Sequence, residues 1–199
     1  FMPFLSSSEM PARLLVLNGN PGKATLCRQM AERIAEAART QGAEVRLVHL
    51  CDLSFDANLA EGYHQRVDWE PDLEALAETL IWSNRLVLVQ PLWWGSAPGR
   101  LKGLFDRLLM PGFAFAYIDG RALPKPLFKG RKARVVISSD TPWFVLRWFY
   151  GNGWVKVLKR QILAFVGYGD LKTMYFGPIR GASAEKLRAM VGRSVKILD

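Results

Sequence analysis

Five short apolar segments alternate along the chain with segments whose apolar residues recur at helical spacing. The apolar segments cover residues 13–18, 43–50, 85–90, 133–138 and 171–176, and each has the length of a buried strand. Helices are predicted at 25–42, 71–82, 98–110, 152–166 and 183–195. Because parallel strands need crossover connections, this alternation predicts a three-layer α/β sandwich around a five-stranded parallel sheet, in the strand order 2-1-3-4-5.

The length of the chain is suited to one substantial hydrophobic core. We find no repeat, low-complexity tract or interdomain linker in its 199 residues, and expect a single domain over residues 1–199. Residues 1–12 are expected to be loosely ordered. Residues 111–131 form an insertion rich in glycine, proline and aromatic residues before the fourth predicted strand.

The charge of the chain restricts its partners. Lysine and arginine outnumber aspartate and glutamate by 27 to 18, a formal net charge of +9 that favours anionic partners. The basic residues are scattered and no RNP-type motif accompanies them, so we expect no nucleic acid partner. The apolar stretch 143–165 is interrupted by four basic residues, and we expect no stable membrane insertion. Two cysteines and two histidines predict no disulfide framework and no metal site, and favour a cytoplasmic protein.

The predicted strand order brings the loops after the first, third and fourth strands to one edge of the sheet. The first of these loops, residues 18–25, leads into a helix N-terminus, whose backbone N–H groups favour an anion. Lys23 and the hydroxyl of Thr25 could add a charge and a donor for a phosphate. A tight turn followed by a capped helix explains the same residues about equally well.

The second loop contains two adjacent tryptophans and a glycine. Trp93 and Trp94 present flat faces suited to a planar aromatic ligand, and Gly95 lets the backbone approach the edge of that ligand. A planar heterocycle such as flavin needs both features. The alternative is that one tryptophan packs under the next helix while the other covers a subunit interface.

Aromatic residues also surround the remaining loops. Phe113, Phe115 and Tyr117 of the insertion could form the wall of an apolar substrate pocket, or fill a surface groove. The aromatic residues from Trp143 to Trp154 form either a lid over a flat substrate or a buried cluster. The residues Ser138, Ser139 and Thr141 offer small hydrogen-bonding groups beside Asp140, which is either a turn residue or a catalytic group.

Three segments together resemble a known family. PLWWGSAP (91–98), LKGLFDR (101–107) and PGFAFAY (111–117) are similar to the central signature of the flavodoxin-like NAD(P)H:quinone oxidoreductase family. The resemblance implies a flavodoxin-like fold and a bound flavin. It also implies ping-pong hydride transfer from NAD(P)H, through N5 of the flavin, to a quinone or a related azo or nitro acceptor.

The resemblance also implies roles for individual residues. The phosphate site of the family falls on Asn20, Thr25, Leu26 and Cys27, with Asn20 where the family usually has histidine. The segment that lines the flavin ring falls on Pro91, Leu92, Trp93, Trp94 and Gly95. A second ring-contacting loop falls on Ser138, Ser139, Asp140 and Thr141, with Asp140 in place of a glycine.

Further roles concern the substrate and the second subunit. Phe115 and Tyr117 match residues that cover the flavin of the other subunit in relatives, which implies a homodimer. Arg188 aligns with a residue near the adenine of FAD, which favours FAD over FMN. Tyr150 could supply a catalytic hydroxyl, and Trp143 could cover the substrate.

Two other functions are compatible with the sequence. One is a non-catalytic electron carrier or a regulatory subunit of the same fold. The other is a basic module that binds nucleic acid or a membrane surface, suggested by the net charge and by the aromatic residues from Trp143 to Trp154.

Overall fold

The strands form one five-stranded parallel sheet. Its order is β2-β1-β3-β6-β7, composed of β1 (Arg13–Asn18), β2 (Glu44–His49), β3 (Arg85–Pro91), β6 (Arg131–Ser138) and β7 (Tyr168–Phe176). Counted along this sheet alone, the order is 2-1-3-4-5, as predicted. The computed structural model describes residues 4–5, 11–62 and 67–199.

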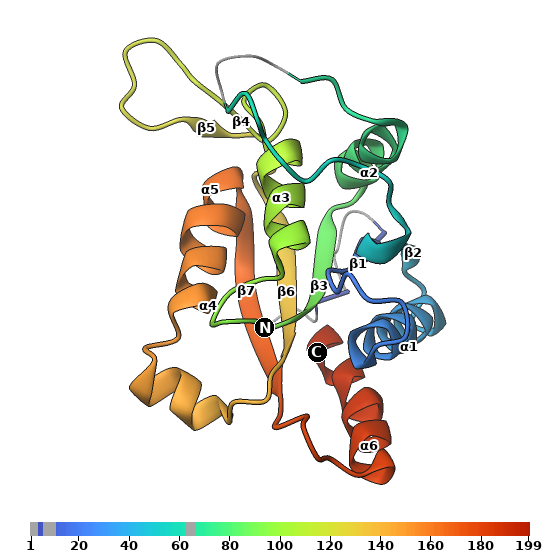
Figure 1. Ribbon diagram of the computed structural model, residues 1–199. Helices are drawn as coiled ribbons and strands as arrows, with labels where there is room; N and C mark the ends of the chain where they lie inside the picture. The colour runs from blue at the N-terminus through green and yellow to red at the C-terminus, as the bar shows by residue number, and fades with distance from the viewer. Residues whose placement is uncertain (1–3, 6–10, 63–66) are drawn as a thin grey trace.

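Helices cover both faces of the sheet (Figure 1). On one face lie α1 (Leu26–Thr40) and α6 (Ala184–Ser194), which pack on Leu14, Val16, Val87 and Val89. On the other lie α2 (Pro71–Trp82), α3 (Gly99–Leu108) and the helical segment 153–166, which pack on Leu15, Leu17, Leu86 and Leu88. Successive strand side chains point to opposite faces, so strands that are apolar throughout require a helix layer on each side.

The fourth predicted helix is not a regular α-helix. It consists of α4 (Gly153–Val157), a π-helical segment (Leu158–Leu163) and α5 (Ala164–Val166), and another π-helical segment (Val145–Phe149) precedes it. Short 3₁₀ segments follow β2 (Leu50–Asp52) and α6 (Val195–Leu198). Sequence periodicity does not distinguish these variants from an α-helix here, because segments of three to six residues are too short to define a period.

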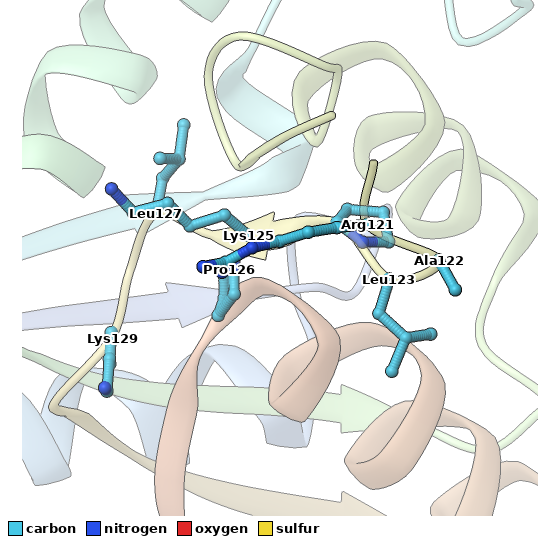
Figure 2. A pocket seen from close by; sticks show the side chains of 8 residues that line it. Arg121, Ala122, Leu123, Lys125, Pro126, Leu127 and Lys129 are labelled. Atoms are coloured by element: carbon cyan, nitrogen blue, oxygen red, sulfur yellow. The ribbon is translucent and has the colours of Figure 1, made fainter. Parts of the chain in front are cut away.

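The insertion contains a small hairpin that the sequence did not predict. In it, β4 (Phe115–Ala116) pairs antiparallel with β5 (Lys125–Pro126). It lies beyond the end of α3, at the edge of the sheet opposite the carboxyl ends of the strands (Figure 1). A cavity of about 830 Å³ lies beside the hairpin. Leu123, Lys125 and Leu127 are among the residues that line it (Figure 2).

The N-terminal segment is described only in part. Most of the residues that were expected to be loosely ordered lie outside the described residues, namely 1–3 and 6–10. Phe4 is fully buried in the core under α1 and α6, and the guanidinium of Arg134 lies 4.3 Å from the centre of its ring. Its carbonyl accepts a hydrogen bond from Nε of Arg85. Phe4 therefore covers two buried arginines.

Candidate functional site

Three loops meet at the carboxyl edge of the sheet and enclose two adjoining cavities. The smaller cavity, about 200 Å³, is lined by Asn20, Leu26, Cys27, Pro91, Leu92, Trp93, Ser138, Ser139, Asp140 and Ile179. The larger, about 590 Å³, is lined by Leu92, Trp94, Gly95, Ser139, Asp140, Thr141, Leu146, Tyr150, Asn152, Gly153, Trp154 and Val155. They share Leu92, Ser139 and Asp140, and therefore form one bipartite site.

The first loop is held by its own side chains. Oδ1 of Asn18 accepts a hydrogen bond from the backbone N–H of Asn20 (3.1 Å), and Oδ1 of Asn20 accepts one from Gly22 (2.9 Å). Oγ1 of Thr25 accepts from the backbone N–H of Arg28 (3.2 Å) and caps α1. These bonds direct the loop into the start of α1, and Thr25 has the capping role that the sequence allowed.

The first turn of α1 forms part of the smaller cavity. Leu26 and Cys27 open the helix and line this cavity, so the positive end of the helix dipole is directed toward it. Sγ of Cys27 lies 3.2 Å from Oγ of Ser138, at the end of β6. Burial raises the pKa of the Cys27 thiol, and its hydrogen bonds oppose this shift only in part. Cys27 is therefore a neutral thiol, not a nucleophile.

The two tryptophans belong to one tight turn, in which Trp93 is the first residue and Trp94 is one of the two central residues. Trp93 and Ser96 exchange two backbone hydrogen bonds of 2.9 Å, and the residues between them, Trp94 and Gly95, have φ values of 50° and 73°. Positive φ at both central positions is the type I′ pattern, which bulky residues rarely adopt. The turn directs the fully exposed Trp94 into the mouth of the larger cavity, while Trp93 borders the smaller one. Neither of them packs in the core.

Asp140 anchors a neighbouring loop. Its Oδ1 accepts a hydrogen bond from the backbone N–H of Arg180 (2.6 Å), beyond the end of β7. Oγ of Ser139 accepts from the backbone N–H of Thr141 (3.0 Å). A Cβ on Gly177 would lie 2.2 Å from the Ser139 carbonyl oxygen, so the two loops touch closely. Of the two roles considered for Asp140, this geometry supports the turn residue.

The larger cavity has a wall that the sequence did not indicate as a unit. Asn152 is left-handed (φ 54°), and its carboxamide lies 2.7 Å (Nδ2) and 2.9 Å (Oδ1) from the Tyr175 hydroxyl. This pair fixes the backbone between Tyr150 and Trp154, both of which line the cavity. The dipeptide Asn152-Gly153 was the available signal, because asparagine and glycine favour left-handed turns. No comparable sequence signal pointed to Leu146, Val155 and Ile179, which also line the two cavities.

Seven of the predicted site residues do not line either cavity. Lys23 is exposed at the first loop, Arg188 is exposed on α6 and Trp143 is exposed after β6. Phe113 packs between Trp69 and Phe128, with ring centres 4.9 and 5.5 Å away. Phe115 is buried and Tyr117 exposed beside the distant hairpin. Within one chain, the three insertion aromatics therefore lie at the opposite edge of the sheet. The seventh residue is the helix cap Thr25.

Among residues 4–5, 11–62 and 67–199, no three histidine, cysteine, aspartate or glutamate side chains are grouped to hold a metal ion. In the same part of the chain, no helix has both the length and the apolar character needed to cross a membrane.

Comparison with known proteins gives matches over nearly the whole chain. A protein family described by its flavodoxin-like fold matches residues 12–197. The NAD(P)H oxidoreductase YcaK of Escherichia coli, itself described as uncharacterized, is 24% identical over 193 residues, which are 92% of each chain. An FMN-dependent NADH:quinone oxidoreductase of Beijerinckia indica is 33% identical over 106 residues, 51% of this chain and 48% of the relative. The match thus spans about half the length of that relative.

A solved structure shares the fold. An FMN-dependent NADH-azoreductase of Bacillus anthracis, determined in complex with FMN, superposes with a TM-score of 0.67 at 15% identity, covering 94% of this chain and 99% of the other. These comparisons correct one expectation. FAD was favoured through Arg188, but several relatives, the Beijerinckia indica protein among them, are named for FMN, and the solved azoreductase contains FMN. The prediction of FAD was wrong, and Arg188 lies away from both cavities.

Proposed function

The chain belongs to the protein family with the flavodoxin-like fold, and from this premise we propose that it is an FMN-dependent oxidoreductase that transfers hydride from NAD(P)H to quinones or related azo or nitro acceptors. The observation that carries the proposal is the bipartite site. It joins a small cavity at a helix N-terminus to a larger, partly aromatic one.

The smaller cavity fits the phosphate-bearing end of FMN. Phosphate binds well where the backbone N–H groups of a helix N-terminus and the helix dipole converge. Leu26 and Cys27 begin α1, a helix of 15 residues, and no acidic residue lies in its first turn. Asn20 borders the same space. These residues would hold the phosphate end of the cofactor.

The shared wall and the larger cavity fit a flat ring. Leu92 on one side, and Ser139 and Asp140 on the other, line both cavities and would flank the ring. Pro91, Trp93 and Ser138 line the smaller cavity alone and would lie toward the phosphate end. When bound, the flavin supplies the hydride chemistry, accepting from NAD(P)H and passing two electrons to the acceptor. Donor and acceptor would use the same face in turn, which gives ping-pong kinetics.

The residues of the chain position and shield the acceptor. Trp94 and Tyr150 both border the larger cavity. Tyr150 would donate its hydroxyl proton in a hydrogen bond to an acceptor oxygen, while Trp94 would exclude water from the open side. The pair of Asn152 and Tyr175 holds this wall in place. Trp154 completes the apolar side of the cavity.

The resemblance to two-subunit relatives bears on the insertion. We infer a homodimer in which Tyr117 of a second copy completes each site, because Tyr117 lies at the opposite edge of the sheet from the site of its own chain. Phe115, the other residue that the resemblance implies, is buried in its own chain and packs against Tyr117, with ring centres 5.5 Å apart. The exposed side chain of Tyr117 is available for such a contact. Cytoplasmic location stays a prediction from the cysteine content.

A spectroscopic titration tests the function. The purified chain is titrated with FMN, then reduced anaerobically with NADPH or NADH, and a quinone is added. We expect bound FMN to bleach and then to recover its absorbance, and initial rates to give parallel double-reciprocal lines. Bound FMN that neither nucleotide reduces would indicate an electron carrier, and intersecting lines would exclude the ping-pong scheme.

A matched pair of variants tests the phosphate site. Leu26→Glu places a carboxylate at the start of α1, where it favours the helix but repels phosphate. We expect the FMN dissociation constant to rise by roughly tenfold or more, equivalent to about 1.4 kcal/mol. Because Leu26 packs in part against the core, the unfolding temperature of the FMN-free variant is measured beside the affinity. Gln29→Glu, one turn along on the exposed face, should leave FMN affinity within about twofold. Equal effects of the two variants would refute the phosphate site.

A further inference from the structure

An unusual concentration of exposed aromatic side chains lies beside the site. Trp143, Phe144, Trp148, Phe149 and Tyr150 are each between 55% and 81% exposed, and we call these five residues the aromatic patch. Single exposed apolar residues are common on protein surfaces, but a contiguous group marks an interaction surface. The proposed reaction uses only Tyr150 of the five.

The backbone holds the aromatic patch away from the core. The π-helical segment Val145–Phe149 projects from the carboxyl end of the sheet (Figure 1). It is fixed through the buried Leu146, whose N–H donates to the Pro142 carbonyl and whose carbonyl accepts from Asn152 (2.7 Å). Leu146 points inward, so its neighbours on the opposite side of the segment are directed to solvent.

The segment that carries the aromatic patch is positively charged, and the carboxylate that precedes it, Asp140, accepts a hydrogen bond from the backbone N–H of Arg180. Residues 141–169 contain no aspartate or glutamate, but they contain Arg147, Lys156, Lys159 and Arg160. The guanidinium of Arg147 lies 5.5 Å from the ring centre of Trp148, so charge and aromatic surface are combined in one place. Such a surface complements an anionic one.

We propose that the aromatic patch binds the surface of an anionic lipid membrane without crossing it. Tryptophan and tyrosine favour the boundary between headgroups and acyl chains, where their rings are apolar and their polar atoms remain hydrated. Basic residues at the same level are attracted to anionic headgroups. Pairing this surface with its equivalent on a second copy would bring two copies of Arg147 together, the cation that lies against the patch itself, which disfavours that alternative.

The position of the aromatic patch relative to the site gives this binding a use. Tyr150 belongs to the patch and also lines the larger cavity, so a bound membrane would lie beside that cavity, next to the Tyr117 side chain that a second copy would contribute. Apolar quinones dissolved in the bilayer could then enter the cavity without crossing water. This second step rests on the proposed function, whereas membrane binding does not.

Vesicle flotation tests the proposal. The full chain, with and without FMN, is floated with vesicles of phosphatidylcholine alone or mixed with phosphatidylglycerol. We expect flotation only with the anionic vesicles, decreasing as salt is added. Trp148→Ser combined with Phe149→Ser should lower the partition coefficient by roughly tenfold or more. The control, Ile81→Ser combined with Leu123→Ser, removes two exposed apolar side chains elsewhere, 59% and 79% exposed, and should float like the wild type.

Each remaining outcome is decisive. Absence of flotation with anionic vesicles overturns the proposal, as does equal flotation of the two double variants. A wild-type dimer that becomes monomeric only in the Trp148 and Phe149 variant would make the patch a subunit contact and overturn it too. Because the FMN-free chain is also floated, failure to bind or reduce FMN would refute the proposed function without affecting this result. Unchanged circular dichroism verifies that the variant is folded.

Discussion

The thiol of Cys27 lies 3.2 Å from the hydroxyl of Ser138, although 111 residues separate them along the chain. One belongs to the first turn of α1 and the other to the last residue of β6. Both line the smaller cavity. This contact therefore joins the proposed phosphate-binding element to the proposed ring-binding element.

The two cysteines should differ in reactivity. We expect iodoacetamide to modify Cys51 before Cys27, because Cys27 is 1% exposed and Cys51 is partly accessible. Burial raises the pKa of both thiols, so accessibility decides the order. Mass spectrometry of timed digests measures the two rates. In urea the rates should become equal, and equal rates in the folded protein would contradict the structure.

Replacing Trp94 should separate stability from activity. Trp94→Gly relieves the left-handed strain of a bulky residue and removes no buried surface, but it adds backbone entropy to the unfolded chain. We expect the free energy of unfolding to change by less than about 1 kcal/mol, while quinone reduction by the FMN-bound protein falls. Chemical denaturation and steady-state rates measure the two effects. A large loss of stability would show that Trp94 packs against the protein.

Two helical glycines should respond oppositely to alanine. Gly103→Ala in α3 places a Cβ 2.3 Å from the backbone carbonyl oxygen of Ala57, so the segments must separate. We expect it to destabilise the protein by about 1–3 kcal/mol. Gly192→Ala in α6 meets open space and should stabilise by about 0.5–1 kcal/mol. Thermal unfolding compares the two, and effects of the same sign would be inconsistent with the packing described.

Asp170 should stabilise the protein in a pH-dependent way. Its Oδ2 lies 2.8 Å from Nη2 of the buried Arg134, and this hydrogen bond lowers the pKa of the Asp170 carboxyl. A carboxyl with a lowered pKa in the folded state stabilises it above the unfolded pKa, and this contribution is lost as the pH falls through the folded value. We expect Asp170→Asn to cost about 1–2 kcal/mol near neutral pH.

The pH dependence provides the check on that prediction. Urea unfolding of both proteins, followed from neutral to acidic pH, should show the two free energies converging below the ordinary range of an aspartate pKa. A constant difference at every pH would mean that Asp170 acts through packing and not through its charge.

Much of the architecture was predictable because it depends on local pattern. The apolar alternation located all five strands of the main sheet. Thr25 caps the start of α1, and Gly42, which has a left-handed conformation, follows its end. The hairpin of β4 and β5 was not predicted, because two-residue strands have no detectable period. The loops around the site were identified, since the ends of parallel strands converge at a reversal of strand order.

The roles of single side chains were less predictable. Asp140 was equally compatible with a turn and with catalysis until its bond to Arg180, 40 residues away, was known. Phe113 was expected in a substrate pocket, but it packs between Trp69 and Phe128. Such contacts join distant parts of the chain, and no local pattern records them.

The sequence by itself determined the parallel α/β sandwich, its strand order and the three loops of the site, because hydrophobic periodicity and helix caps act between near neighbours. Only the tertiary structure decided which face each aromatic side chain occupies. It buried Phe115, directed Trp94 through a left-handed turn toward the cavity and left Trp148 in solvent. The reason is physical: burial depends on which distant segments cover a residue, and that covering exists only once the chain has folded.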